Sequence, residues 1–251
     1  MIEIVPDFAK NWACFLDVDG TLLDFAGHPQ AVERKPELVA TLTSLHRLVP
    51  VAFISGRNIV DLDRLFAPLR LPVAGQHGAE RRTPSGRTIA MERPSPMSAA
   101  RDALAGFAEA RPGLLLEDKG LTLALHYRLA PHFESEIEVM MKAWMHKLGG
   151  QVMLLPGNMV YELRPTATDK GAAIAAFMEE SPFAGRVPVF IGDDTTDEDG
   201  FRMVNRMGGL SVKVGGGQTV ADGRLSGVAT VLQWLEDYVR WLGRKTTGIT
   251  A

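Results

Sequence analysis

The sequence of 251 residues, 46% hydrophobic and 23% charged, has ordinary globular composition and is long enough to bury a substantial core in one or two domains. Its net charge of −3 gives no support for binding to nucleic acid or to an acidic membrane, and a single cysteine, Cys14, excludes an internal disulfide. It contains no apolar run of about eighteen residues and no basic segment followed by an apolar one at the N-terminus. We therefore expect a soluble, cytoplasmic protein.

Strand and helix patterns alternate over the first part of the chain. Short apolar runs predict strands over 12–16, 49–54 and 71–74. Apolar residues at helical spacing predict helices over 36–48 and 59–66. The order strand, helix, strand, helix indicates a parallel sheet with crossover helices.

The pattern changes after residue 79. A turn-like stretch at 81–88 predicts a hairpin between short strands, and a helix followed by two strands then occurs twice. The predicted helices cover 98–110 and 133–148, and the predicted strands cover 114–117, 121–128, 152–155 and 159–163. The tight turn within each strand pair indicates an antiparallel α+β unit inserted into the parallel α/β chain.

The α/β alternation returns after residue 164. Helices are predicted over 169–178 and 228–242, and strands over 187–191 and 210–214. The expected fold class is therefore α/β. We predict a Rossmann-like parallel-sheet core of residues 1–79 and 165–251, with an inserted α+β domain of residues 80–164.

Four polar segments of the predicted core follow apolar strands or begin helices: Asp17 with Asp19; Ser55; Lys170; and Asp193 with Asp194 and Asp197. The carboxyl ends of parallel strands lie along one edge of a sheet, where ligands bind. Two acidic clusters at this edge would repel each other unless a hard cation such as Mg²⁺ lay between them. Magnesium, a hydroxyl and a lysine can together neutralise a phosphoryl group, so that an adjacent carboxylate can attack phosphorus.

These four segments resemble, in order, the four motifs of the haloacid dehalogenase (HAD) superfamily of phosphohydrolases, and the inserted unit resembles the C2-type cap domain of that superfamily. More narrowly, a set of segments resembles the trehalose-6-phosphate phosphatase family: Phe53–Arg57, Gly75–Glu80, Glu162–Pro165, Asp169–Gly171 and Gly192–Glu198. The resemblance implies a magnesium-dependent phosphatase that hydrolyses trehalose 6-phosphate to trehalose and phosphate through an aspartyl-phosphate intermediate.

The resemblance also implies catalytic roles. Asp17 is expected to be the nucleophile, and Asp19 the acid that protonates the departing sugar oxygen. Asp19 then acts as the base on the water that opens the aspartyl phosphate. Ser55 and Lys170 are expected to hold the phosphoryl oxygens.

The metal ligands implied by the resemblance come from the two acidic segments. Magnesium is expected to be bound by the Asp17 carboxylate, the Asp19 main-chain carbonyl and Asp193. Asp194 and Asp197 are either further ligands or acceptors that hold the ligands in place, and the sequence does not rank these alternatives.

Substrate contacts are expected from both domains. The residues are Gly20, Arg57, Gln76, His77 and Gly78 in the core, and Glu117, Lys119 and Glu162 in the cap, with His126 and Arg128 as further candidates. Disaccharide recognition needs several hydrogen-bonding groups, and acidic side chains suit hydroxyl donors. His77 between glycines is equally well a structural turn residue, and strand alternation places some cap residues simply on a solvent face.

Three alternatives to the expected function stay open. One is a related capped phosphatase for sucrose phosphate, mannosylglycerate phosphate or another sugar phosphate. A second is a non-catalytic phosphosugar-binding domain, although the presence of both Asp17 and Asp19 argues against it. A third is a metal-dependent glycosyltransferase, which leaves Lys170 and Asp193 unexplained. The expected partner is a small sugar phosphate, with no nucleic acid and no membrane, and we expect a monomer.

Overall fold

The computed structural model describes residues 7–24, 36–157 and 159–247; residues 1–6, 25–35, 158 and 248–251 of the predicted domains lie outside the described residues. The chain forms two compact units, one of Met1–Ile89 with Asp169–Ala251 and one of Ala90–Thr168. The prediction set the first boundary at residue 80. In the structure β4 (Glu80–Arg82) pairs antiparallel with β3 (Val73–Gly75), so the core unit continues beyond this point.

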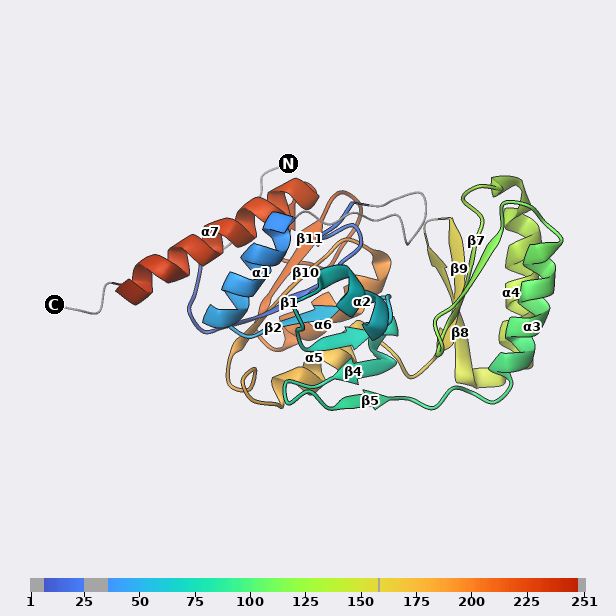
Figure 1. Cartoon of the computed structure of the whole chain (residues 1–251), viewed down its shortest axis with the longest axis horizontal. Coiled ribbons are helices and arrows are strands. Elements are labelled where there is room, and N and C mark those ends of the chain that lie inside the picture. The colour runs from blue at the N-terminus through green and yellow to red at the C-terminus, as the bar shows by residue number, and fades with distance from the viewer. Residues whose placement is uncertain (1–6, 25–35, 158, 248–251) are drawn as a thin grey trace. The chain divides into compact units, whose positions relative to one another are not determined.

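An eight-stranded sheet forms the centre of the core unit, in the order β12-β11-β10-β1-β2-β3-β4-β5 (Figure 1). The six strands from β12 to β3 in this order pair in parallel. The remaining strands of the sheet are β1 (Trp12–Leu16), β2 (Val51–Ile54), β5 (Thr88–Ala90), β10 (Val187–Gly192), β11 (Leu210–Val214) and β12 (Gly223–Leu225). Because parallel strands end at the same edge, the residues that follow β1, β2 and β10 are brought together there.

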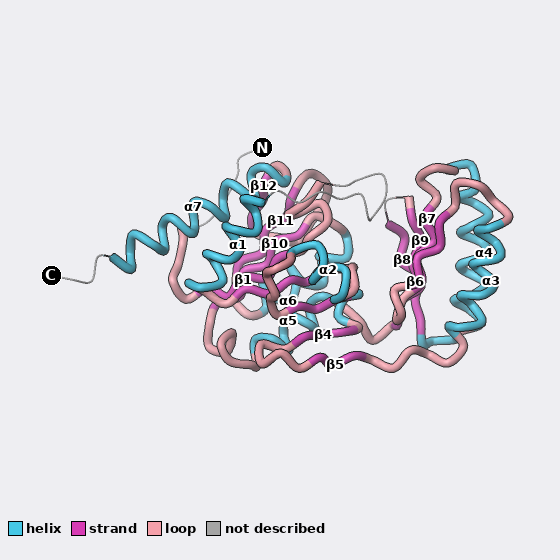
Figure 2. The backbone as a smooth tube through the Cα atoms, viewed as in Figure 1, coloured by secondary structure: helices cyan, strands magenta, loops and turns pink. Residues whose placement is uncertain are grey.

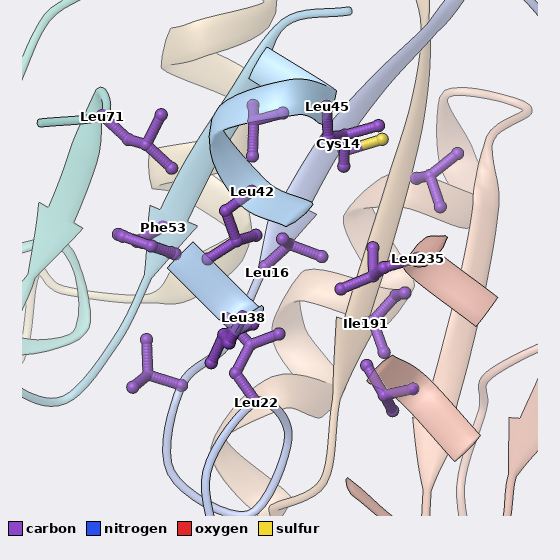
Figure 3. Packing of buried hydrophobic residues seen from close by; sticks show 14 of the residues in the cluster. Cys14, Leu16, Leu22, Leu38, Leu42, Leu45, Phe53, Leu71, Ile191 and Leu235 are labelled. Carbon is purple, nitrogen blue, oxygen red and sulfur yellow. The ribbon is translucent and has the colours of Figure 1, made fainter. Parts of the chain in front are cut away.

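Helices cover both faces of the core sheet. The first group, α1 (Pro36–Leu48), α2 (Ile59–Phe66) and α7 (Val228–Thr247), packs on one face, and α5 (Lys170–Met178) and α6 (Glu198–Arg206) pack on the other. Strand β1 contacts both groups by simple alternation. Cys14 and Leu16 lie with the first group (Figure 3), and Phe15 lies with the second. A sheet covered on both faces requires continuous apolar strands, which explains the apolar run in β1.

The inserted unit is a four-stranded antiparallel sheet with α3 (Met97–Glu109) and α4 (Glu134–Lys147) on one face (Figure 2). The strand order is β6 (Leu115–Asp118), β7 (Leu123–His126), β9 (Val160–Pro165) and β8 (Val152–Gly157). Leu125 and Leu163 pack among the helices. Alternation along the strands therefore places Glu162 and its neighbours of the same parity on the other face of the sheet.

The predicted α/β fold class is confirmed, and most predicted elements lie within a few residues of the observed ones. The prediction gave no strand for Gly223–Leu225 and no bounds for the helix Glu198–Arg206. A three-residue edge strand that begins with glycine has too weak a pattern to be recognised from sequence. None of the helices in the described part of the chain combines the length and the apolar character that crossing a membrane requires.

Truncating Leu42 tests the packing between α1 and the core sheet. Leu42 is completely buried among β1, β2 and α7, so Leu42→Ala should lower the free energy of unfolding by about 2–5 kcal/mol. Urea unfolding followed by tryptophan fluorescence measures this change. Val60→Ala on α2 is the control, because Val60 is 66% exposed and its truncation should change stability by less than about 0.5 kcal/mol. Equal effects of the two substitutions would contradict this packing.

Candidate active site

A buried lysine joins the ends of β1 and β10 to the start of α5. The Nζ atom of Lys170 lies 2.7 Å from Oδ1 of Asp17 and 2.6 Å from Oδ1 of Asp197. Asp17 directly follows β1, and both it and Lys170 are almost inaccessible, at 4% and 2% exposure. Two carboxylates from separate segments thus share one ammonium in the protein interior.

The start of α5 fixes the position of this lysine. The side chain of Asp169 accepts a hydrogen bond from the main-chain N–H of Ala172 and caps the helix, so that Lys170 is its first residue. The next residue, Gly171, has no room for a side chain, because a Cβ atom there would lie 2.6 Å from the main-chain oxygen of Asp199. Close packing of α5 against α6 therefore holds the backbone that carries Lys170.

Asp197 organises the acidic loop after β10. Its second oxygen, Oδ2, accepts hydrogen bonds from the main-chain N–H groups of Asp193, at 3.0 Å, and Asp194, at 2.9 Å. Both carboxylate oxygens of Asp197 therefore accept from protein donors. This favours a role in holding the candidate metal ligands in place over a role as a metal ligand itself. Asp194 is exposed and caps the turn that follows, where Asp197 completes a capping box.

Three carboxylates converge at this edge of the sheet. Asp17, Asp193 and Asp197 each offer an oxygen, and these atoms lie within 4.8 Å of one another. Burial and the neighbouring Asp197 and Asp193 carboxylates raise the pKa of Asp17 in spite of Lys170. Burial and Asp197 likewise raise the pKa of Asp193 to about 6. The Lys170 ammonium alone does not balance these three carboxylates, and hard oxygen donors with excess negative charge fit a divalent cation such as Mg²⁺.

Gly20 and Thr21 pack directly against Asp193. Gly20 has φ +81°, and a Cβ atom there would lie 2.1 Å from Oδ2 of Asp193. The Thr21 hydroxyl donates to Oδ1 of Asp193 at 3.3 Å. The turn after β1 thus fits closely around the carboxylate that follows β10, and only glycine has both the backbone conformation and the space.

The Asp19 carboxylate is turned toward Arg57 and is not one of the three converging groups. The Arg57 guanidinium donates from Nε to Oδ2 at 2.7 Å and from Nη2 to Oδ1 at 2.6 Å. Such a two-point pair fixes the carboxylate plane. The prediction that Asp19 binds metal through its main-chain carbonyl stays a prediction.

The segment after β3 holds the segment after β2 in place. The main-chain N–H of His77 donates to the main-chain oxygen of Ser55, and that of Gln76 donates to the main-chain oxygen of Arg57, each at 2.9 Å. Gln76 and His77 both have positive φ, +49° and +57°. A Cβ atom on Gly56 would lie 2.8 Å from Nε2 of His77. The ring of His77 therefore packs on the turn of Ser55, whose Oγ accepts the Arg57 main-chain N–H at 3.1 Å.

Gly78 links the same turn to α5. It has φ +100°, and a Cβ atom there would lie 3.0 Å from the main-chain oxygen of Asp169. Glu80 supports the turn from the other side, since its Oε1 accepts from Gln76 Nε2 at 3.0 Å and from the main-chain N–H of Ile59 at 2.9 Å. The predicted substrate residues of this segment are thus also structural.

The residues of the inserted unit that the sequence singles out form a charged cluster on the sheet face opposite α3 and α4. Glu117 Oε2 lies 2.9 Å from Nε2 of His126, and Lys119 Nζ lies 3.3 Å from Oε2 of Glu162. Burial raises the pKa of Glu117, but its hydrogen bond to His126 and the charge of Lys119 outweigh this and leave the pKa lowered. Arg128 lies beyond the end of β7.

Three residues that support the site have no role in the prediction from sequence, although two of them, Thr21 and Glu80, lie within its motifs. They are Thr21, Glu80 and Lys213, whose ammonium donates to the main-chain oxygen of Asp193. Lys213 carried a usable signal, because a lysine within the apolar strand Leu210–Val214 is rarely buried without a specific partner.

Substituting Gly20 tests the close approach to Asp193. Gly20→Ala should destabilise the fold and weaken Mg²⁺ binding at least about tenfold, because the new methyl group displaces the Asp193 carboxylate. Gly86→Ala is the matched control, since Gly86 also has positive φ, +88°, but no atom near the added methyl group. It should cost about 1–2 kcal/mol of stability and leave Mg²⁺ binding unchanged. Isothermal titration and thermal unfolding measure both effects, and equal losses of metal affinity would contradict the packing.

The raised pKa of Asp193 predicts a pH-dependent stability in EDTA. Because the pKa rises from about 3.9 in the unfolded chain to about 6, the folded protein binds this proton more tightly. The contribution of Asp193 to the free energy of unfolding is fully present below about pH 4. It is lost as the pH rises through about 6. Relative to Asp193→Asn, the wild-type protein should lose about 2–3 kcal/mol between pH 4 and pH 7, measured by urea unfolding. A constant difference between the two proteins across this range would contradict the shift.

Comparison with known proteins identifies the family of the chain. The trehalose-phosphatase family model matches residues 15–224. The trehalose-6-phosphate phosphatase of Escherichia coli K12 is 44% identical over 236 residues, which cover 92% of this chain and 88% of that protein.

Two solved structures share the fold. The C-terminal domain of C. albicans trehalose-6-phosphate phosphatase matches with a TM-score of 0.81 and 22% identity, over 92% of this chain and 93% of that one. A haloacid dehalogenase-like hydrolase from Bacteroides thetaiotaomicron matches with a TM-score of 0.67 and 15% identity, over 91% and 99%. The chain therefore belongs to the trehalose-phosphatase family, a family of phosphoric monoester hydrolases with the haloacid dehalogenase fold.

Proposed function

We propose that this protein hydrolyses trehalose 6-phosphate to trehalose and inorganic phosphate through a phosphorylated Asp17. The observation that carries the proposal is the buried Asp17 carboxylate, which Lys170 holds at 2.7 Å beside Asp193 and Asp197. Family membership and the name of the E. coli relative support the substrate. The excess of carboxylates at the site supports magnesium as the cofactor.

The residues that would hold Mg²⁺ are Asp17, Asp193 and the main-chain carbonyl of Asp19. When bound, the ion supplies positive charge that offsets the carboxylates and the phosphoryl oxygens. Asp197 keeps both oxygens on protein donors, so its role is to hold Lys170 and the loop of Asp193.

In the first half of the reaction, an oxygen of Asp17 attacks phosphorus, and the bond from phosphorus to the sugar oxygen breaks. Asp19 gives its proton to this departing oxygen. Lys170 and the Ser55 hydroxyl contact the phosphoryl oxygens; Ser55 Oγ already accepts from Arg57, so its own hydrogen is directed elsewhere.

In the second half, a water molecule attacks phosphorus and the bond to Asp17 breaks, which releases phosphate and restores the carboxylate. Asp19 takes the proton of this water and returns to its starting state. Both oxygens of Asp19 accept hydrogen bonds from Arg57 in the structure. This pair has to open before Asp19 can carry a proton, and the incoming phosphate offers Arg57 another anionic partner.

The unit of residues 90–168 is proposed to be the cap that recognises the sugar. Its charged cluster of Glu117, Lys119 and Glu162 lies on the sheet face opposite α3 and α4. Carboxylates accept and an ammonium donates, so together they match the mixed hydrogen-bonding pattern of sugar hydroxyls.

Phosphate release from a panel of sugar phosphates tests the function. We expect release from trehalose 6-phosphate in preference to glucose 6-phosphate and sucrose 6-phosphate, in Mg²⁺ and not in EDTA. Asp17→Asn should lower kcat by at least about 10³-fold because it removes the nucleophile. Asp102→Asn, on the exposed surface of α3, should leave kcat unchanged.

The outcomes of this panel separate the alternatives. Preferred release from another sugar phosphate would keep the chemistry and reject the substrate. Binding of trehalose 6-phosphate without release would reject the enzyme and leave a phosphosugar-binding domain. Retained activity in Asp17→Asn would reject the role of Asp17.

Removing one charge from the cap tests substrate recognition separately from chemistry. Glu162→Gln should raise KM for trehalose 6-phosphate about tenfold, because the side chain that pairs with Lys119 loses its charge. Turnover of p-nitrophenyl phosphate, which has no sugar, should change much less. Glu138→Gln is the control, since Glu138 forms an ion pair with Lys142 within α4. Equal effects of Glu162→Gln on both substrates would contradict sugar recognition.

A further inference from the structure

Lys213 is a buried cation that the proposed reaction does not use. It is 5% exposed and lies in β11 next to β10, where it is paired in register with Gly192. Its ammonium donates to the main-chain oxygen of Asp193, the residue that follows Gly192. The other residues of β11 are apolar except Ser211.

The Lys213 side chain lies on the face of the sheet that α5 and α6 cover. Val212 and Val214 pack with α1 and α7, so alternation directs Lys213 to the face covered by α5 and α6. Burying an ammonium on a single carbonyl is costly, and among the described residues Lys213 forms no ion pair at 4.0 Å or less. This cost indicates that the contact of Lys213 with Asp193 has a specific use.

We propose that Lys213 is a positioning residue that fixes Asp193 for cation binding, an inference that rests on the proposed function. Three contacts then hold Asp193: one from its own loop, one from the turn after β1 and one from β11. Asp197 accepts from its main-chain N–H at 3.0 Å, Thr21 donates to its carboxylate at 3.3 Å, and Lys213 donates to its main-chain oxygen. Without the third contact, the peptide group after Asp193 can rotate and carry the carboxylate away from Asp17.

Positioning and simple charge predict opposite effects on metal affinity. If Lys213 acted only through its charge, its removal would strengthen Mg²⁺ binding, because a cation near the site repels another cation. If Lys213 holds the carbonyl of Asp193, its removal weakens Mg²⁺ binding in spite of the lost repulsion. The sign of the change therefore distinguishes the two roles.

Isothermal titration of Mg²⁺ into the full chain, without substrate, measures this sign. Lys213→Met should raise the Kd for Mg²⁺ about tenfold or more, as loss of a contact behind a ligand typically does. Lys213→Gln keeps a donor on a shorter side chain and should raise Kd by about threefold to tenfold. Lys142→Met, on the exposed surface of α4, removes the same charge elsewhere and should leave Kd unchanged.

Thermal unfolding in EDTA shows which variants fold. If Lys213→Met does not fold, the Kd of Lys213→Gln for Mg²⁺ decides between positioning and simple charge. An unchanged or lower Kd in the folded variants would overturn the role of Lys213 while the magnesium site stands. Absence of Mg²⁺ binding by the wild-type protein would overturn both this inference and the proposed cofactor.

Discussion

The double ion pair of Lys170 is the interaction on which the site depends. One ammonium, at 2.7 Å from Asp17 and 2.6 Å from Asp197, joins the end of β1, the start of α5 and the loop after β10. Each of these segments has a further support: β1 pairs with its parallel neighbours, Asp169 caps α5, and the second oxygen of Asp197 holds the loop. A buried pair of this kind is worth little as a source of stability, so its value lies in the fixed geometry that it gives the Asp17 carboxylate.

The same arrangement leaves the edge of the sheet with more negative than positive charge. Asp193 brings a third carboxylate within 4.8 Å of the other two, and close packing by Gly20 and Thr21 keeps it there. The carboxylates repel one another, but the burial of apolar side chains between the sheet and its two helical layers stabilises the fold enough to offset this repulsion. The imbalance favours ligands that carry positive charge, and a cation bound there in turn attracts phosphate. Stability and binding are therefore coupled at this site through charge.

The strand ends and the acidic residues that follow them are predictable from the sequence because their signals are local. An apolar run that ends in Asp17 and Asp19, or in Asp193, marks a strand end, and parallel topology then brings the ends together. The support of the site is less predictable because it depends on side-chain directions between distant segments. Neither the two-point pair of Arg57 with Asp19 nor the contact of Lys213 with Asp193 has a local pattern. The strands Glu80–Arg82 and Thr88–Ala90 show the same limit, since a hairpin pattern does not say which sheet it joins.

The most direct test of the account is to look for the phosphoryl group on Asp17. Wild-type protein with Mg²⁺ and trehalose 6-phosphate is quenched in acid during the first turnover, and the peptide that carries Asp17 is analysed by mass spectrometry. If Asp17 is the nucleophile, a phosphoryl adduct on Asp17 forms before free phosphate and decays as phosphate appears. Free phosphate produced at the same rate with no adduct at any time, or an adduct on another residue, would contradict the central role of Asp17.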